Sequence, residues 1–581
     1  MNENHDREYN SGIAETINLG EDSSVAGKDS VIKVLKSFFK TIRTNFSQKS
    51  EKSMLSYLLE SVYLKLLSGK IRVFGVFLLS FSLTSLIISY LIGESLSVFI
   101  SDINTFTGIV LLIISLILFT SNKSLHQLII GSKILSSLSI VYNEQLLVTE
   151  DETVRGNASS TPFFLGVICG IFSVIYPVSA ISMFVLSLLL VLFIFNRPEF
   201  GMLLILAVLP LLSKPLLLTL MCITFLALIY RYLLGKRHID FNVSTALIII
   251  AILYIVFRCI VTDGYTFSNR FFIYISFFIS CIAVMNLVRS TAMFRRTFTV
   301  LIKMTRAFTV ILILYYLSNM FFGTSAVGNF LYNLNISNLV YSITSASFAA
   351  PFLAMAVPMN FSYFIGINKG KEALLNAIWL LLLFASLIYV SSYELILICI
   401  ISCVAILVFF KIKYIFLILP APFAAYALQK IFNSIPSEYS ISASNGAINT
   451  FSEALDLMKL NPLFGSGPYV TGFNGNMLFN VLITFGITGV VLLAAVVISM
   501  TASTIKSISA DFMKSNKARF LSIGLLCSQL SFLAVCIFTD IYCDLNVIFM
   551  FSAIMSASYT SGKCYKADYI DTGVVREYKN K

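Results

Sequence analysis

Long hydrophobic runs separated by short polar connections recur along the chain from residue 73 to residue 559. A helix needs about 20 mostly apolar residues to cross a bilayer core of roughly 30 Å, and it satisfies its backbone hydrogen bonds internally. The pattern therefore predicts an all-α, polytopic transmembrane helical bundle with about 14–16 spans. The predicted spans cover 73–92, 104–121, 163–178, 179–195, 199–213, 215–230, 243–261, 270–288, 307–323, 339–366, 374–391, 392–410, 413–428, 476–500, 519–537 and 541–559.

One polar connection is much longer than the others. It covers residues 429–475 and contains the sequence NPLFGSG over Asn461–Gly467, before the hydrophobic pattern resumes at Asn476. Loops held by a rigid scaffold commonly carry function. We therefore predict that binding or chemistry takes place in or beside this loop.

The composition agrees with a membrane protein. Mean hydropathy is +0.88, with 57% hydrophobic and 12% charged residues, far from the usage of soluble domains. The sequence contains no P-loop motif, and no soluble segment of about 100 residues is available to hold a nucleotide-sugar donor. These features disfavour ATP-driven transport and nucleotide-sugar enzymes.

The distribution of Lys and Arg predicts the orientation, because basic connections are retained in the cytoplasm. Alternate connections are rich in Lys and Arg, whereas 322–339 carries no charged residue and 429–475 carries few. We therefore expect both termini in the cytoplasm and the long loop on the extracytoplasmic side. The net charge of +12 then reflects orientation in a membrane, and no nucleic-acid partner is expected.

Charge and hydropathy also divide the chain into regions. Residues 1–70 form a predicted cytoplasmic region that lacks the apolar core of a signal peptide and includes a basic amphipathic helix over 31–46. That helix could lie on an anionic membrane surface or be a solvated linker. An N-terminal extension with two spans follows over 71–150, then a membrane core over 151–560 and a cytoplasmic tail over 561–581.

The residue types that bind metals or form disulfides are poorly placed for either. Most of the ten cysteines lie within hydrophobic runs, where a free thiol behaves as a small hydrophobe. His5, His126 and His238 are all expected on the cytoplasmic side. We therefore predict no metal, no cofactor and no histidine general base on the outer face.

A few charged residues fall at the ends of hydrophobic runs, where a charge is costly and therefore a candidate for function. Arg258 and Arg270 bracket Asp263 on the expected outer face, and could pair with it locally or bind a substrate phosphate. Asp540 and Asp544 flank the last outer turn. We interpret these two carboxylates as interfacial groups, with a divalent-cation site as the alternative.

Residues 449–493, NTFSEALDLMKLNPLFGSGPYVTGFNGNMLFNVLITFGITGVVLL, resemble the outer-loop signature of the O-antigen ligase and O-antigen polymerase family. That signature has an aromatic-led helix, a Pro-Leu-x-Gly-x-Gly turn, and a His-Asn-x-x-Leu entry into a helix with Gly-x-x-Gly. Other segments follow in the family's order, namely RPEFGMLLILAVLPLL, NRFFIYISFFISCIAVMNLVRS, ASFAAPFLAMAVPMNF, SSYELILICIISC and FTDIYCDLNVIFMFSAIMS. The resemblance covers about residues 163–560.

By this resemblance the protein would be a metal-independent glycosyltransferase of the bacterial cytoplasmic (inner) membrane. It would take a polyprenyl-pyrophosphate-linked glycan, such as one on undecaprenyl pyrophosphate, at the outer face of that membrane. It would transfer the glycan to a glycan acceptor or extend it, as in polysaccharide biosynthesis. Its other partners would be the lipid bilayer and cell-envelope assembly proteins.

Three family positions differ in this sequence. Gly475-Asn476 replaces the family's His-Asn pair, and Ser392-Tyr393 replaces a Ser-Arg pair. Ala447 stands at or near the position of a further arginine. Because a histidine supplies a base near neutral pH and arginines clamp phosphate, the reaction would need substitute groups.

The predicted substitutes lie on the expected outer side. The candidate catalytic bases are Glu453, Asp456 and Glu394, and pyrophosphate can leave without strong protonation. The two glycines of the NPLFGSG sequence permit a tight turn or a close approach to a phosphate or sugar. The candidate substrate-binding residues are Arg270, Lys430, Lys459, Gly465, Gly467, Asn476 and Tyr393.

Two other functions stay open on the sequence. A relative without catalysis could act as a scaffold or lipid-glycan binder, which the basic N-terminal region would suit. A lipid-glycan flippase or transporter would be favoured by inverted repeats and by helices broken within the membrane. The best support for it is the run 339–367, which contains two prolines.

Overall fold

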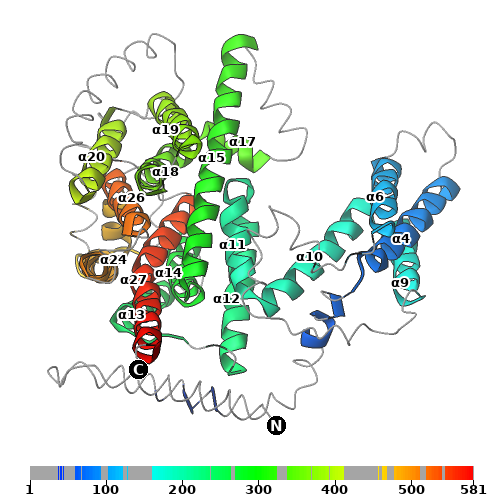
Figure 1. Cartoon of the computed structure of the whole chain (residues 1–581), viewed down its shortest axis with the longest axis horizontal. Helices are drawn as coiled ribbons and strands as arrows, with labels where there is room; N and C mark the ends of the chain where they lie inside the picture. The colour runs from blue at the N-terminus through cyan, green and yellow to red at the C-terminus, as the bar shows by residue number, and fades with distance from the viewer. Residues whose placement is uncertain are drawn as a thin grey trace.

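The protein is a multi-pass helical bundle in the computed structural model (Figure 1). Over the part of the chain that the structure describes there is no strand, and nine helices are long and apolar enough to cross a membrane. The predicted all-helical, multi-pass architecture is therefore confirmed, whereas the number of 14–16 spans stays a prediction. The described residues are 37, 40, 41, 43, 44, 59–92 (except 64, 67 and 68), 103–121, 123, 127, 160–263 (except 236 and 238), 269–322, 337–410 (except 368, 369, 391 and 392), 456, 459, 461–467, 477–510, 519–538 and 544–579.

Most helices follow the predicted hydrophobic runs within a few residues. They are α4 (Ile71–Ile92), α6 (Ile103–Phe119), α9 (Ser160–Ile171), α10 (Val178–Asn196), α11 (Pro198–Val208), α12 (Lys214–Leu233), α13 (Val243–Asp263), α14 (Asn269–Leu287), α15 (Thr291–Phe322), α17 (Ser337–Thr344), α18 (Ala346–Ile367), α19 (Lys371–Val390), α20 (Tyr393–Phe410), α24 (Met477–Ser509), α26 (Arg519–Phe538) and α27 (Leu545–Lys579). Short 3-10 segments, η2 (Phe172–Val174) and η3 (Leu209–Leu211), extend α9 and α11. The predicted span 413–428 lies outside the described residues.

Helices α4, α6 and α9 form a group that lies apart from the main bundle and is joined to it through α10 (Figure 1). Helix α9 packs on α4 through two glycines. A Cβ atom at Gly166 would lie 1.9 Å from Oγ of Ser80, and one at Gly170 would lie 2.5 Å from Cβ of Thr84. Glycine lets the two backbones approach closely, so packing groups α9 with the N-terminal extension, although the division at residue 150 places it in the core.

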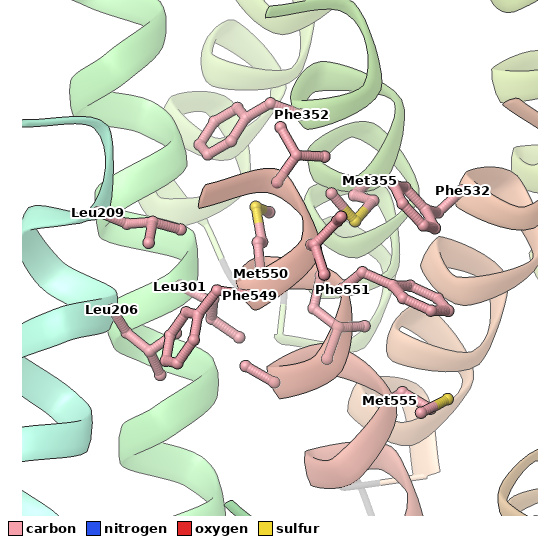
Figure 2. Packing of buried hydrophobic residues seen from close by; sticks show 14 of the residues in the cluster. Leu206, Leu209, Leu301, Phe352, Met355, Phe532, Phe549, Met550, Phe551 and Met555 are labelled. Atoms are coloured by element: carbon pink, nitrogen blue, oxygen red, sulfur yellow. The ribbon is translucent and has the colours of Figure 1, made fainter. Parts of the chain in front are cut away.

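The core of the main bundle is built around α18, α26 and α27. Helix α18 is buried continuously from residue 348 to residue 360. Figure 2 shows Met355 of α18 beside Phe532 of α26, and the ring of Phe532 stacks on that of Phe551 of α27 with their centroids 4.2 Å apart. Since lipid tails are as apolar as these side chains, van der Waals packing rather than transfer out of water holds such helices together.

Two helices extend beyond the predicted membrane spans, and the predicted start of the α15 span at residue 307 is wrong. Helix α15 begins at Thr291 instead of 307, so it contains the Lys- and Arg-rich stretch that was assigned to a cytoplasmic turn. Helix α27 continues to Lys579 instead of ending at 559. Charged residues lower hydropathy without breaking a helix, and α15 stays helical where it packs on α11 and α27.

Hydrogen bonds tie together several helix ends that are rich in Lys and Arg. Arg231, at the end of α12, donates to the carbonyl oxygen of Phe195 (3.1 Å) and to Oδ1 of Asn196 (2.6 Å). Glu199, buried at the start of α11, forms an ion pair with Arg237. A buried carboxylate is costly unless it is paired, so this pair fixes the α12–α13 connection against α11.

The predicted amphipathic helix over 31–46 falls mostly outside the described residues, but Arg43 is described. Its Nη2 donates to the carbonyl oxygen of Gly235 (2.8 Å), and its guanidinium carbon lies 5.7 Å from the ring centroid of Tyr232. Tyr232 belongs to the last turn of α12, and Gly235 follows that turn. The N-terminal region therefore contacts the membrane core at this helix end.

Helix α18 runs without a break through Pro351 and Pro358. A proline has no N–H, so Pro358 cannot bond to the carbonyl oxygen of Ala354 one turn earlier. Ser531 of α26 donates its hydroxyl to that oxygen at 3.0 Å, and Cys399 of α20 lies 3.9 Å from it. Neighbouring helices thus supply the hydrogen bond that the proline removes, which keeps the helix continuous.

We predict that Ser531 and Pro358 are energetically coupled. Ser531→Ala should lower the free energy of unfolding by about 1–2 kcal/mol, because the carbonyl oxygen of Ala354 loses its hydroxyl donor. In a Pro358→Ala background the restored N–H bonds to that oxygen, so the same change should cost clearly less. Unfolding of the four proteins of this double-mutant cycle in detergent measures the coupling.

Ser528→Ala is the matched control, since Ser528 also lies buried on α26 but donates to Gly524 within its own helix. Ser528→Ala should lower the free energy of unfolding by the same amount in the wild-type and the Pro358→Ala backgrounds. Equal costs of Ser531→Ala in both backgrounds would show that Ser531 does not compensate for the proline.

Candidate functional site

The NPLFGSG sequence forms a compact turn. The N–H of Gly465 donates to the carbonyl oxygen of Asn461 at 2.8 Å, which closes the turn. Gly465 and Gly467 adopt φ values of 71° and 91°, a region that side chains with a Cβ rarely occupy. Both glycines are buried, whereas Leu463 and Phe464 are exposed. The turn therefore places its glycine backbone against the protein.

The surface that receives this turn is a break in a membrane helix. Helix α24 has a non-helical residue at Gly486, with φ 66° and ψ −169°. In an uninterrupted helix the carbonyl oxygens of Ile483 and Thr484 would accept from the N–H groups four residues later. Instead they accept from the N–H groups of Ser466 (2.7 Å) and Gly467 (3.1 Å). The turn thus replaces two lost helical hydrogen bonds.

The N–H groups after the break are satisfied in the same way. Those of Ile487 and Thr488 donate to the carbonyl oxygens of Pro462 (3.0 Å) and Leu463 (3.2 Å). The hydroxyl of Thr488 also donates to Leu463, at 2.8 Å. Backbone groups at membrane depth must find partners inside the protein, so the turn and the helix break depend on each other.

Close glycine packing makes this docking possible. A Cβ atom at Gly465 would lie 2.5 Å from the backbone nitrogen of Gly486, and a Cβ at Gly486 would lie 2.5 Å from the nitrogen of Gly465. Each glycine therefore leaves the space that the other occupies. The glycines serve a close approach, as the sequence predicts, but the group approached in this structure is the backbone of α24.

Helix α13 contributes two side chains to this junction, the guanidinium of Arg258 and the hydroxyl of Tyr254. Arg258, which is 7% exposed, donates from Nη2 to the carbonyl oxygen of Gly465 at 2.7 Å, and its guanidinium lies 5.9 Å from the ring centroid of Phe464. Tyr254, one turn earlier, donates its hydroxyl to the carbonyl oxygen of Phe485 at 2.7 Å. The junction thus unites the turn, α24 and a cation within the hydrophobic span of α13.

The hydrogen bond from Arg258 to Gly465 is a contact that the sequence does not predict. An arginine inside the run VSTALIIIAILYIVFRCIVTD is a signal of a polar contact; its predicted pairing with Asp263 stays a prediction, because the Asp263 side chain lies outside the described residues. The hydrogen bond to Gly465 crosses more than two hundred positions. No short-range pattern reveals a partner at that distance in sequence.

The other predicted site residues are only partly placed. Asp456 and Lys459 form an exposed ion pair with 2.7 Å between Oδ1 and Nζ, and their side chains are 70% and 74% exposed. Such a pair is worth little to stability. Arg270, Tyr393 and Glu394 begin helices α14 and α20, but their side chains lie outside the described residues, as do Glu453, Lys430 and Asn476. Their roles stay predictions.

A second polar cluster, formed by Lys214, Asp544 and Asn546, lies where η3, α12, α17 and α27 meet. Asp544, which precedes α27 and is 2% exposed, has a buried Oδ2 with no described hydrogen-bond donor. Burial raises the pKa of Asp544 to about 6, against the opposite effects of the Lys214 ammonium and the backbone N–H of Asn546. Among the described residues no group of three or more His, Cys, Asp or Glu could hold a metal ion.

No protein-family model matches this chain, and no curated protein matches it.

We predict that Gly486→Ala undocks the turn. The alanine must adopt φ 66° and its Cβ would meet the backbone of Gly465, so the folded state should lose about 2–4 kcal/mol. Hydrogen exchange of the Ser466 and Gly467 amides measures the docking directly, and both should exchange much faster.

Leu463→Ala is the matched control, because that side chain is 59% exposed and the substitution keeps the backbone hydrogen bonds. Amide protection at residues 466 and 467 should persist in this variant. Retained protection in Gly486→Ala would contradict the assigned contact.

The buried carboxyl of Asp544 predicts an unusual pH dependence. Its folded pKa of about 6 exceeds its unfolded value of about 3.9, so the folded state holds more protons between about pH 4 and pH 6. The free energy of unfolding therefore rises as pH falls through this range. Above pH 6 the buried charge of Asp544 lowers it by roughly 3 kcal/mol. Asp544→Asn should raise the melting temperature at pH 7.5 and remove this pH dependence.

Thermal unfolding in detergent at a series of pH values checks this expectation. Asp456→Asn, a change at an exposed and ion-paired carboxylate, should leave the pH profile unaltered. An unchanged profile in Asp544→Asn would show that Asp544 is not the titrating group.

Proposed function

We propose that the protein binds a polyprenyl-pyrophosphate-linked glycan at the outer face of the bacterial cytoplasmic membrane and transfers or extends it. The observation that carries this proposal is the junction between the NPLFGSG turn and the break in α24, with Arg258 beside it. Such a substrate has its lipid in the bilayer and its pyrophosphate at the surface. A site for it needs polar groups held firmly where membrane helices meet a loop.

The electrostatics of the junction suit this substrate class. Arg258 brings a permanent positive charge to the membrane side of the turn, in a largely buried setting where charge interactions are stronger than in water. A pyrophosphate leaving group gains negative charge at the bond that breaks as the reaction proceeds. A fixed cation near that group lowers the barrier, because it needs no reorganisation during the reaction.

The proposed reaction is a glycosyl transfer. The acceptor hydroxyl oxygen forms a bond to the anomeric carbon, and a carboxylate, from Glu453, Asp456 or Glu394, takes the hydroxyl proton. The bond between the anomeric carbon and the phosphate oxygen breaks, and polyprenyl pyrophosphate leaves with the electron pair. Arg270, Lys430 and Lys459 are further proposed phosphate contacts.

A non-catalytic scaffold or lipid-glycan binder is the second candidate, and one observation favours it. The N–H groups of Gly465, Ser466 and Gly467 all bond to protein carbonyl oxygens, so the turn in this state offers no such donor to a phosphate. The flippase alternative, in contrast, gains no support from the two prolines of the run 339–367, although the run is interrupted at Ser345, between α17 and α18. Helix α18 is continuous and buried there, rather than broken around a cavity.

Deletion of the gene in its native host tests the proposed function. We predict accumulation of polyprenyl-pyrophosphate-linked glycan in the lipid extract together with loss of surface polysaccharide. Arg258→Gln, which keeps a donor for Gly465 but removes the charge, should lower transfer roughly 100-fold, whereas Arg258→Lys should retain more of it. Equal membrane abundance of the variants separates this effect from misfolding.

Unchanged glycan levels after deletion would overturn the enzymatic proposal and leave the binding role. Full complementation by Arg258→Gln would show that the charge of Arg258 takes no part in the reaction. Glu453→Gln then tests the proposed base, since loss of transfer with normal abundance would keep that residue in the mechanism.

A further inference from the structure

Arg306 lies halfway along α15, in a helix whose composition suits a membrane span. It is half-buried, and two asparagines hold its guanidinium in place. Nε donates to Oδ1 of Asn360 on α18 at 3.1 Å, and Nη2 donates to Oδ1 of Asn376 on α19 at 2.9 Å. Asn360 is itself fixed, because its Nδ2 donates to Thr305 and to the carbonyl oxygen of Ala356. The guanidinium therefore has a defined orientation.

Two aromatic rings flank the same group. The guanidinium carbon of Arg306 lies 5.5 Å from the ring centroid of Tyr363 and 5.7 Å from that of Trp379. Trp379 is the single tryptophan of the chain. Tryptophan and tyrosine are enriched where membrane proteins meet the lipid headgroups, and cations bind well to their faces. This environment is typical of the boundary between acyl chains and headgroups.

The charge of Arg306 is not neutralised within the described structure. Its two hydrogen-bond acceptors are neutral amide oxygens, and no described carboxylate forms an ion pair with it. A guanidinium has five N–H donors, of which these bonds use two. A half-buried cation with free donors favours an anionic ligand, because a charge in a span is costly until it is paired.

The surroundings add positive charge and a surface for acyl chains. Lys303, one turn before Arg306 on α15, and Lys371, the first residue of α19, are both exposed. Glu372 is the exposed acid beside Lys371, and the positive N-terminal end of the α19 dipole lies at the same place. Leu374, Leu375, Ile378 and Leu381 of α19 are exposed hydrophobics.

We propose that Arg306, with Asn360 and Asn376 orienting it, binds the phosphate of an anionic phospholipid in the leaflet at the Lys- and Arg-rich end of the bundle. The acyl chains of this lipid lie along the exposed hydrophobic face of α19. Basic pockets between membrane helices are typical sites for anionic headgroups. A phospholipid fits better than free phosphate, because an exposed apolar helix face adjoins the cation.

Native mass spectrometry of the full-length protein tests this site. Protein released from nanodiscs of phosphatidylglycerol mixed with phosphatidylcholine should retain phosphatidylglycerol in preference. Arg306→Gln should lower that preference at least fivefold, since one cation near a charged membrane surface contributes about 1 kcal/mol. Lys506→Gln, at an exposed lysine in the last turn of α24, is the matched control and should leave the preference unchanged.

Asn376→Asp keeps the test decisive if Arg306→Gln fails to fold. The new carboxylate would take the place of an amide oxygen that already lies 2.9 Å from Arg306, so this variant should fold and neutralise the guanidinium internally. It should lose the preference for phosphatidylglycerol while its melting temperature in pure phosphatidylcholine stays equal or rises.

Undiminished phosphatidylglycerol retention in Asn376→Asp would overturn the proposal. Equal losses in Arg306→Gln and Lys506→Gln would also overturn it, because they would indicate a diffuse surface charge effect. Inorganic phosphate, added at millimolar concentration to detergent-solubilised protein, should not stabilise it. Stabilisation of the wild type but not of Asn376→Asp would indicate that the site binds the free anion and not a phospholipid.

Discussion

The constraint on which this structure depends is that every backbone N–H and carbonyl group at membrane depth needs a partner. Within the described part of the chain, distant segments supply partners at three places where membrane helices depart from regular hydrogen bonding. The break at Gly486 is bonded by the NPLFGSG turn, and the gap at Pro358 is filled by Ser531. In η3, Asn546 donates to the carbonyl oxygens of Leu209 and Leu212, at 3.2 and 3.0 Å. These contacts select one arrangement of the helices.

The same constraint explains why the candidate site lies at α24. A helix break there would leave polar groups without partners unless a loop docked on it, and a docked loop becomes as rigid as the helices that hold it. Arg258 strengthens the arrangement because its hydrogen bond to Gly465 also ties α13 to the turn. Membrane stability and the position of the polar site are therefore consequences of one set of contacts.

The sequence predicts the helices well and the junctions poorly, for a physical reason. Hydropathy reports whether a segment tolerates lipid, and this property is local, so most spans are found within a few residues. It fails at α15, because Lys303 and Arg306 lower the hydropathy of a helix that packing keeps intact. The sequence does not reveal the role of Gly486, because its partner Gly465 lies in another segment. Asn476 and Glu453, in contrast, stay predictions of the resemblance alone.

The hydrogen bonds of the turn determine which substitutions can distinguish an enzyme from a scaffold. The N–H groups of Gly465, Ser466 and Gly467 all bond to protein carbonyl oxygens in this state, so chemistry at these three positions must come from side chains around them. A change that undocks the turn would harm an enzyme and a scaffold alike, because it displaces both the long polar segment and the first part of α24. A change of charge at Arg258 that keeps the hydrogen bond to Gly465 would harm only a function that uses the charge. Charge, rather than glycine geometry, therefore distinguishes glycan transfer from structural support at this junction.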